Sequence, residues 1–226
     1  MPRTDNTAAD LYLCDITQQS PVYAALLSPL TEEERMKAEK YLRDEDRLRY
    51  VTGRHLIRMA AFERLGITDP DIRRTDRGKP YIPDVEGFCF SISHSGSYAV
   101  MAVSHIPIGA DIEETIPIDW QGLSQTFDER ARGMISSAAD PQRCFYSIWT
   151  MREAFAKEIG TGLQIFEDED IDMDYARGIA YYGGQAHHIA CIPLQGYALT
   201  VCTPAAQDIK LRWVGLQHFN RPYHRP

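Results

Sequence analysis

The chain has 226 residues, of which 44% are hydrophobic and 25% are charged, and its formal net charge is −8 at pH 7. These values are typical of a globular protein with one large domain or two small halves, and the negative charge disfavours nucleic acid as a partner. No apolar run approaches the roughly 20 residues that cross a bilayer, and the first residues lack a secretory apolar core, so we expect a cytoplasmic protein with no membrane role. The five cysteines are widely spaced and odd in number, which fits reduced thiols rather than a structural zinc site.

Two helices are expected in the first third of the chain. The run Thr31-Glu32-Glu33-Glu34 has the form of a capping box, which predicts a helix from Thr31 towards Leu42. Asp44 can cap a second helix that continues to about Leu65 and stops at Gly66. Eight Lys/Arg against four Asp/Glu lie between residues 35 and 58. Such a basic region on an acidic protein indicates a discrete anionic ligand, although solvated helix faces explain any single charge equally well.

Strands are expected in the middle of the chain and again near its end. Phe88, Phe90 and Ile92 alternate with small polar residues, and a turn at Ser95-Gly96 separates this strand from another over Tyr98 to Ser104, which predicts a hairpin. Ile108 to Glu113 is a third extended piece. A helix with an apolar face from Phe145 to Ile159 ends at Gly160. Further strands are expected near Ile179–Tyr182, His187–Ile192 and Tyr197–Thr203.

A short internal repeat indicates two related halves. Tyr98-Ala99-Val100 recurs as Tyr197-Ala198-Leu199, and a helix containing Ala-Phe precedes each run, at Ala61-Phe62 and Ala154-Phe155. We therefore expect an α+β fold of two similar halves related by a pseudo-twofold axis, divided into residues 1–108 and 109–226, with the active site at their interface. Chance similarity between short strand sequences is the alternative explanation.

Asp111 and Glu113 are candidate metal ligands. In a strand the period of two places both carboxylates on one face, with Ile112 on the other. Two neighbouring negative charges repel unless they are solvated or neutralised by a cation, and hard carboxylate oxygens suit Mg²⁺. An Asp-x-Glu pair alone is a weak signal, since it also occurs at solvated strand ends.

The expected helix before Gly160 contributes a second set of charged residues. Glu153 and Lys157 are four residues apart, which is also the favourable spacing for an ordinary surface ion pair. Arg152 is harder to explain as a surface charge, because it projects from the apolar stripe between Trp149 and Ala156. An unpaired charge there would be costly, so a buried partner or an anionic ligand is implied.

The residues from Ser91 to Gly96 place hydroxyls and an imidazole, His94, at the end of a hairpin. Hydroxyls, imidazole and the free amides of a glycine turn are suitable phosphate donors. A nucleophilic Ser-His pair is the rival interpretation, but neighbours in sequence rarely reach each other in catalytic geometry. The chain has no Gly-x-Ser-x-Gly, Gly-x-Gly-x-x-Gly or P-loop motif, so hydrolase, Rossmann and P-loop interpretations lack support.

The order of these motifs resembles the 4'-phosphopantetheinyl transferase superfamily. The resemblance covers roughly Thr31 to Leu163 and is to the longer, two-halved type, which acts on carrier domains of peptide, polyketide and fatty-acid synthases. The motifs that carry it are Gly78-Lys79-Pro80, Phe90 to Ser95, Gly109 to Glu113, and Trp149 to Lys157 followed by Gly160 to Leu163. Two positions depart from the family pattern, since Ala110 replaces Ile or Val and Arg152 replaces Lys.

The resemblance implies a role for each matching residue. Asp111, Glu113 and Glu153 would ligate Mg²⁺, and Glu153 and Lys157 would be the catalytic residues. Coenzyme A would be bound by a set of polar and basic residues, with His94 and Ser93 at its phosphates, Lys79 near the nucleotide, and Lys37 with Arg49, or Arg54 in competition, at the 3'-phosphate.

The implied activity is that of a holo-[acyl-carrier-protein] synthase. It moves the 4'-phosphopantetheine group of coenzyme A to a serine of an apo acyl or peptidyl carrier protein and releases 3',5'-ADP. Coenzyme A and the carrier are then the partners, and we expect a monomer that needs neither nucleic acid nor membrane. Two alternatives remain at this stage, a non-catalytic module that binds coenzyme A or a carrier protein, and a metal-dependent phosphohydrolase.

Overall fold

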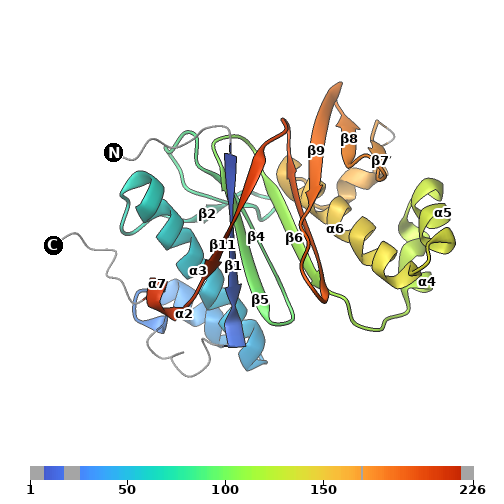
Figure 1. Ribbon diagram of the computed structural model, residues 1–226. Coiled ribbons are helices and arrows are strands. Elements are labelled where there is room, and N and C mark those ends of the chain that lie inside the picture. The colour runs from blue at the N-terminus through green and yellow to red at the C-terminus, as the bar shows by residue number, and fades with distance from the viewer. Residues whose placement is uncertain (1–7, 18–25, 169, 220–226) are drawn as a thin grey trace.

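A four-stranded and a five-stranded β-sheet pack against each other, and each is covered on its outer face by one long helix (Figure 1). Within the described residues β2 (Arg73–Arg74) and β3 (Pro80–Tyr81) form a further, two-stranded sheet. The structure is a computed structural model that describes residues 8–17, 26–168 and 170–219. No helix within these residues is long and apolar enough to cross a membrane. The expected cytoplasmic location stays a prediction.

The first sheet carries the long helix α3 (Asp44–Leu65). Its strand order is β11-β1-β5-β4, in which β1 (Ala8–Asp15) runs parallel to β11 and antiparallel to β5 (Tyr98–Ser104). The hairpin expected from the sequence is confirmed, because β4 (Cys89–Ser95) pairs antiparallel with β5. The strand β4 is thus an edge of this sheet.

The two helices of the first half begin and end largely as the sequence indicates. The capping box is confirmed at helix α2 (Glu32–Glu39), where Thr31 Oγ accepts from the Glu34 amide at 3.2 Å and Glu34 Oε2 accepts from the Thr31 amide at 3.0 Å. Helix α3 stops at Gly66, which takes φ 71° and suits glycine. The expectation that Asp44 caps α3 is wrong, since the N-cap is Arg43 and Asp44 is already helical.

The second sheet carries the helix α6 (Pro141–Ile159). Its strand order is β6-β10-β9-β8-β7, and β10 (Tyr197–Thr203) is antiparallel to both β6 (Gly109–Glu114) and β9 (Gln185–Cys191). The strand β6 is therefore an edge strand. The remaining elements are β2 (Arg73–Arg74), β3 (Pro80–Tyr81), α4 (Trp120–Leu123), η2 (Ser124–Thr126), α5 (Glu129–Ser137), η3 (Leu163–Glu167), β7 (Asp172–Asp174), β8 (Ile179–Tyr182), β11 (Asp208–Val214) and α7 (Leu216–Phe219).

The two halves repeat one arrangement, which confirms the α+β class with two similar halves. The order β1-α3-β4-β5 of the first half recurs as β6-α6-β9-β10 in the second. The repeated strands β5 and β10 have the same burial pattern, with a half-buried first residue followed by six buried ones. The first residues, Tyr98 and Tyr197, meet edge to face with ring centroids 4.9 Å apart. The sequence repeat therefore marks equivalent positions at the interface between the sheets.

The division of the chain at residue 108 stays a prediction. The second sheet does begin at Gly109, with β6. However, β11 lies beside β1 in the first sheet although it follows the whole second sheet in sequence. The last described strand thus crosses back and ties the C-terminal part of the chain to the N-terminal half.

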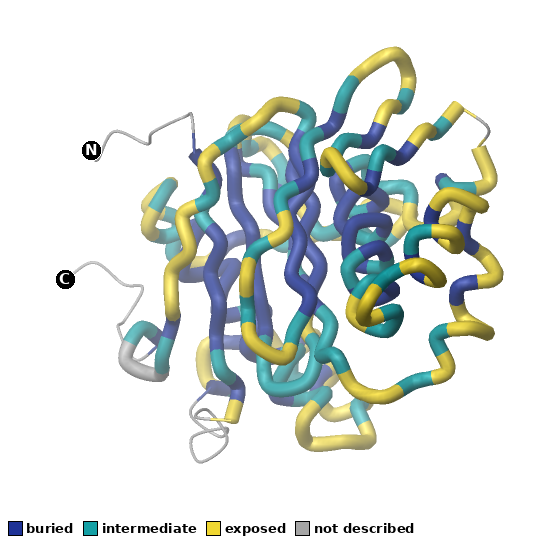
Figure 2. The backbone as a smooth tube through the Cα atoms, turned by 45° about the vertical axis from the view of Figure 1, so that its right-hand side comes forward, coloured by how far each residue is buried: buried dark blue, intermediate teal, exposed yellow. Residues whose placement is uncertain are grey.

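Burial is concentrated in the central strands and on the inner faces of α3 and α6 (Figure 2). The layer between the sheets is aliphatic and includes Leu11, Val100, Ile112 and Leu199. Helix α6 approaches β6 closely, since a Cβ atom at Gly109 would lie 1.8 Å from the carbonyl oxygen of Ala154. Only glycine fits there, and this close packing holds one face of α6 directly over β6.

Candidate active site

A row of hydroxyls from β4 joins the two sheets. Ser91, Ser93 and Ser95 alternate along the strand, while Phe90 and Ile92 between them point to the α3 side. The strand β6 is an edge strand, so amides on its outer side lack a ladder partner. Ser91 Oγ accepts from the Ala110 amide at 3.0 Å, and Ser95 Oγ accepts from the Glu114 amide at 3.0 Å. The serines thus satisfy the edge of β6 and align it with β4.

Asp111 lies at the centre of this junction and is 2% exposed. Its Oδ1 accepts from Ser93 Oγ at 2.7 Å and from Lys157 Nζ at 2.6 Å, and Lys157 Nζ also donates to Ser93 Oγ at 3.1 Å. Its Oδ2 is buried and has no hydrogen-bond partner among the described residues. A buried carboxylate oxygen without a partner is costly, so this atom is suited to a ligand.

Glu113 and Glu153 are the two other carboxylates that the sequence assigns to a metal, and both are half-buried. Burial raises the pKa of Glu113, and the negative charges of Asp111 and Glu153 raise it further, although Ser95 Oγ donates to Glu113 Oε2 at 2.8 Å. The pKa of Glu153 is raised by burial and by Asp111, while Lys157 opposes the shift. The three carboxylates therefore share one electrostatic environment.

The donor set fits a hard divalent cation, because it consists of carboxylate oxygens. The pKa values of Glu113 and Glu153 are raised, and one oxygen of Asp111 has no partner among the described residues. Within the described ranges, no group of three His, Cys, Asp or Glu side chains stands in a metal-binding arrangement. One oxygen of Asp111 is instead neutralised by Lys157. Metal ligation by Asp111, Glu113 and Glu153 consequently stays a prediction, to which the neighbourhood of the three groups lends support.

A cavity of about 240 Å³ opens beside Lys157, between α3 and the end of β4. Its lining residues include His94 from β4, Lys157 from α6, and three arginines, Arg49, Arg54 and Arg74. His94 stays partly exposed, and its pKa is lowered because neighbours displace part of its hydration and because Arg49 and Lys157 are positively charged. The cavity therefore suits an anion.

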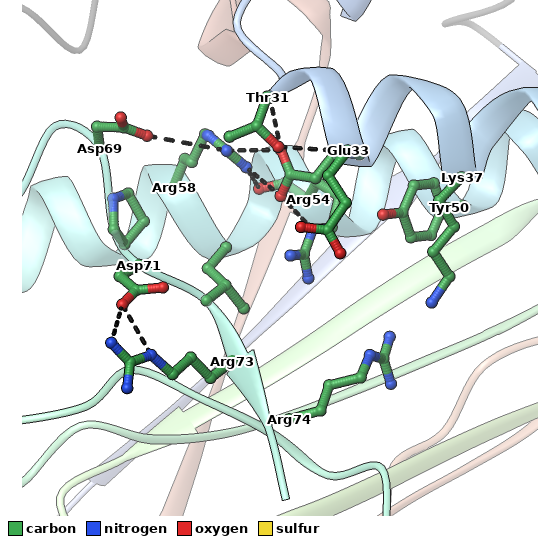
Figure 3. Close-up of a pocket in the computed structure, with 13 residues that line it drawn as sticks. Thr31, Glu33, Lys37, Tyr50, Arg54, Arg58, Asp69, Asp71, Arg73 and Arg74 are labelled. Atoms are coloured by element: carbon green, nitrogen blue, oxygen red, sulfur yellow. Dashed lines mark hydrogen bonds and ion pairs between the residues drawn. The ribbon is translucent and has the colours of Figure 1, made fainter.

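A second cavity of about 600 Å³ shares Tyr50, Arg54 and Arg74 with the first. Lys37 and Arg74 point toward one another across it, with Tyr50 beside Lys37 (Figure 3). Lys37 Nζ lies 5.5 Å from the centroid of the Tyr50 ring, and burial together with the charges of Arg74 and Arg54 lowers the pKa of Lys37. The floor is fixed by Glu34, whose carboxylate binds Arg54 Nε at 2.6 Å and an Arg58 amino group at 2.7 Å.

Arg74 was missed as a site residue, although the sequence shows it within a basic cluster. It lies on β2, whose backbone pairs with β3 of the Gly-Lys-Pro motif. The pairing of Arg74 with Pro80 carries the guanidinium into the wall of both cavities. The Arg73-Arg74 run was the available signal, but the register of this two-stranded sheet could not be seen from the sequence.

Two residues that we expect to bind the nucleotide, Arg49 and Lys79, form hydrogen bonds with other groups of the protein. The Arg49 guanidinium donates to the Gly96 carbonyl at 3.0 and 2.8 Å and pairs with Asp46 at 2.6 Å. Lys79 Nζ donates to the Glu158 carbonyl at 2.7 Å, and burial lowers its pKa. Both side chains line cavities at the site, so their role at the nucleotide stays a prediction.

The buried partner expected for Arg152 is present. Its guanidinium lies 3.7 Å from the Phe166 ring centroid and 4.8 Å from that of Phe127. It also binds Asp128 Oδ2 at 3.3 Å and the Tyr175 hydroxyl at 3.1 Å. These contacts explain the buried charge without an anionic ligand and anchor α6 on the side that faces away from β6.

Comparison with known proteins gives the family. Residues 17–106 match the family described as 4'-phosphopantetheinyl transferase, N-terminal, and residues 107–202 match the 4'-phosphopantetheinyl transferase superfamily. The chain is 32% identical over 187 residues to the 4'-phosphopantetheinyl transferase ffp of Bacillus subtilis, covering 78% of this chain and 83% of that protein.

Other relatives match with similar identity. For the 4'-phosphopantetheinyl transferase gsp of Aneurinibacillus migulanus the identity is 28%, covering 80% of this chain and 79% of that protein. For the Sfp enzyme of Bacillus subtilis (strain 168) it is 34%, covering 62% and 64%. With both halves matched and the resemblance carried by the motifs that build this site, the chain belongs to the 4'-phosphopantetheinyl transferase superfamily and is a two-halved 4'-phosphopantetheinyl transferase.

Proposed function

We propose that this enzyme transfers the 4'-phosphopantetheine group of coenzyme A to a serine of an apo carrier protein, with Mg²⁺ held by Asp111, Glu113 and Glu153. The observation that carries the proposal is the buried Oδ2 of Asp111, which has no hydrogen-bond partner among the residues that the structure describes. The same carboxylate binds Lys157, which lines a cavity together with three arginines. Mg²⁺ commonly takes one or two protein carboxylates and leaves other positions to water and phosphate. It would neutralise charge on the pyrophosphate of coenzyme A.

We assign coenzyme A to the two cavities, which share Tyr50, Arg54 and Arg74. Its pyrophosphate lies at His94 and Lys157, and its 3'-phosphate lies where Lys37, Arg54 and Arg74 converge. Support comes from the lowered pKa of Lys37, which burial and the nearby charges of Arg74 and Arg54 cause, because a phosphate would stabilise the charged form of Lys37. Ser93 serves to orient Asp111, because its hydroxyl hydrogen is donated to that carboxylate.

Chemistry follows from the groups around the pyrophosphate. The hydroxyl oxygen of the carrier serine attacks the phosphorus that bears the pantetheine arm, and the bond from that phosphorus to the bridging oxygen breaks, so that 3',5'-ADP leaves. Glu153, a carboxylate of the site on the same helix as Lys157, takes the serine proton directly or through a water. Lys157, displaced from Asp111 by the pyrophosphate, stabilises the charge that develops on the leaving phosphate.

We also propose that the active unit is a monomer. Both walls of the site come from one chain, with β4 and α3 from the first half and β6 and α6 from the second. A second copy is therefore not needed to complete it. Sedimentation velocity at the assay concentration tests this, and a dimer that loses activity on dilution would contradict it.

The function is tested by incubating the enzyme with coenzyme A, Mg²⁺ and apo forms of fatty-acid, polyketide and peptide carriers. Intact mass should show one added phosphopantetheine on a carrier serine, with one equivalent of 3',5'-ADP released. Asp111→Asn should abolish the gain, whereas Glu114→Gln on the same strand should retain it, because Glu114 bonds Tyr197 instead. A binding module would give no mass gain with any carrier, and a phosphohydrolase would release inorganic phosphate without modifying the carrier.

A further inference from the structure

The hydrogen bonds of the Ser95 hydroxyl fix the direction in which it donates its hydrogen. It accepts from the Glu114 amide at 3.0 Å, and it lies 2.8 Å from Glu113 Oε2. An ionised carboxylate can only accept, so the single hydroxyl hydrogen must be donated to Glu113. Ser95 therefore ties the backbone of β6 and the side chain of Glu113 to one point on β4. The Oε2 atom of Glu113 is thereby held in place.

Ser93 repeats this arrangement one step along the strands. It donates to Asp111 Oδ1 and accepts from Lys157, as Ser95 donates to Glu113 and accepts from an amide. Each serine is 18 residues from its carboxylate, so the same register serves both. Two neighbouring rungs of β4 thus each fix one carboxylate of β6.

We infer that Ser95 is a positioning residue that presents Glu113 to the divalent cation, an inference that rests on the metal site proposed above. A hydrogen bond from a neighbouring group fixes the orientation of a ligating carboxylate, and losing such a bond typically weakens metal affinity by about 10- to 100-fold. The charge of the ligand itself is unchanged. Ser95 therefore acts on the concentration of metal required rather than on the bonds made and broken during transfer.

Ser91 supplies a matched control. It lies on the same strand and accepts from the Ala110 amide at 3.0 Å, so it performs the same backbone task on β6. In contrast to Ser95, it donates to no carboxylate of the site among the described residues. Ser91→Ala therefore reports what the loss of one hydroxyl between the sheets does alone.

The experiment measures manganese binding by electron paramagnetic resonance with coenzyme A present and no carrier, and the Mg²⁺ concentration that gives half-maximal transfer. Ser95→Ala should raise both the manganese dissociation constant and the half-saturating Mg²⁺ about tenfold, with a much smaller change in kcat at saturating metal. Ser95→Thr, which keeps the hydroxyl, should restore both. Ser91→Ala should shift them less than threefold.

Two outcomes would overturn the inference. One is an equal shift for Ser91→Ala and Ser95→Ala, which would reduce Ser95 to a structural link between sheets. The other is a loss of kcat for Ser95→Ala with an unchanged metal requirement. Glu113→Gln separates the inference from the function on which it rests, because unchanged manganese binding in that variant would refute the metal site itself.

Discussion

Removing one carboxylate of the site is expected to change the stability of the metal-free enzyme in opposite directions at Asp111 and Glu153. Asp111 is paired with Lys157 at 2.6 Å and accepts from Ser93 at 2.7 Å, so Asp111→Asn loses favourable charged contacts. Glu153 has a raised pKa, because burial and Asp111 disfavour its ionised form. Glu153→Gln therefore removes an unfavourable charge.

The magnitude for Asp111 follows from its burial and from the exposure of its partner. Hydrogen bonds to charged groups are worth about 1.5–3 kcal/mol, but the Lys157 side chain is 30% exposed, so solvent screens part of the pair. The substitution also relieves the repulsion between Asp111 and the ionised Glu113 and Glu153, which offsets part of the loss. We therefore expect Asp111→Asn to lower the free energy of unfolding by about 1–2 kcal/mol. For a chain of this size each kcal/mol shifts Tm by about 2–4 °C, which gives a fall of about 2–8 °C.

The sign for Glu153 depends on pH. A carboxyl group with a raised pKa in the folded state disfavours folding above that pKa, where it is ionised, and no longer does so below its unfolded pKa. Glu153→Gln should thus raise Tm at neutral pH, and the gain should vanish as the pH falls through the folded pKa and then the unfolded one.

Differential scanning fluorimetry with a chelator, from neutral pH down to about pH 4, measures both effects. Asp172→Asn is the matched control for Asp111→Asn, since its 2.9 Å pair with Arg130 is exposed on both sides and its loss should change stability by less than about 1 kcal/mol. The reasoning is refuted if Asp111→Asn and Glu153→Gln shift Tm in the same direction at neutral pH.

Three further measurements bear on substrate binding, metal binding and packing. Arg74→Ala should raise KM for coenzyme A about tenfold and KM for dephospho-coenzyme A much less. Arg130→Ala, which removes an exposed pair with Asp172 away from both cavities, should change neither, and equal effects of Arg74→Ala on both substrates would contradict the 3'-phosphate assignment. The Mg²⁺ concentration for half-maximal transfer should rise as the pH is lowered from neutral towards the ordinary carboxyl range, because protons compete at Glu113 and Glu153, whose pKa values are raised. A value that does not change with pH would argue against these ligands. In a urea titration, Arg152→Lys should lower the free energy of unfolding by about 1–2 kcal/mol, because an ammonium cannot reproduce the stacking on Phe127 and Phe166. Arg143→Lys, at an exposed position of α6, should leave it unchanged.

Local signals were sufficient for much of the fold. The capping box joins Thr31 to Glu34, and the helix stop at Gly66 directly follows Leu65. Each signal lies within one helical turn, so it can be recognised without knowledge of tertiary packing. The alternation along β4 and the tyrosine repeat of β5 and β10 are also local patterns. Together with the family motifs they were enough for the class of fold, the two similar halves and the activity.

Other features depend on contacts between residues far apart in the chain. No local pattern shows that β11 lies beside β1, because that pairing joins residues 200 positions apart. Both sheets have edge strands, so the sequence does not indicate which sheet β11 extends. The partners of Arg152 are likewise distant, and the sequence could only state that its charge required one.

The sequence determines which residue types form the site. Which hydrogen bonds and ion pairs they make depends on how edge strand β4 of the first sheet lies beside edge strand β6 of the second. Asp111 and Glu113 share a face because a strand has a period of two, and Glu153 and Lys157 share a side because a helix has one of 3.6. Asp111 pairs with Lys157 because α6 packs against Gly109 of β6 and because β4 supplies hydroxyls to the open edge of β6. Among the described residues, this arrangement leaves one buried oxygen of Asp111 without a hydrogen-bond partner.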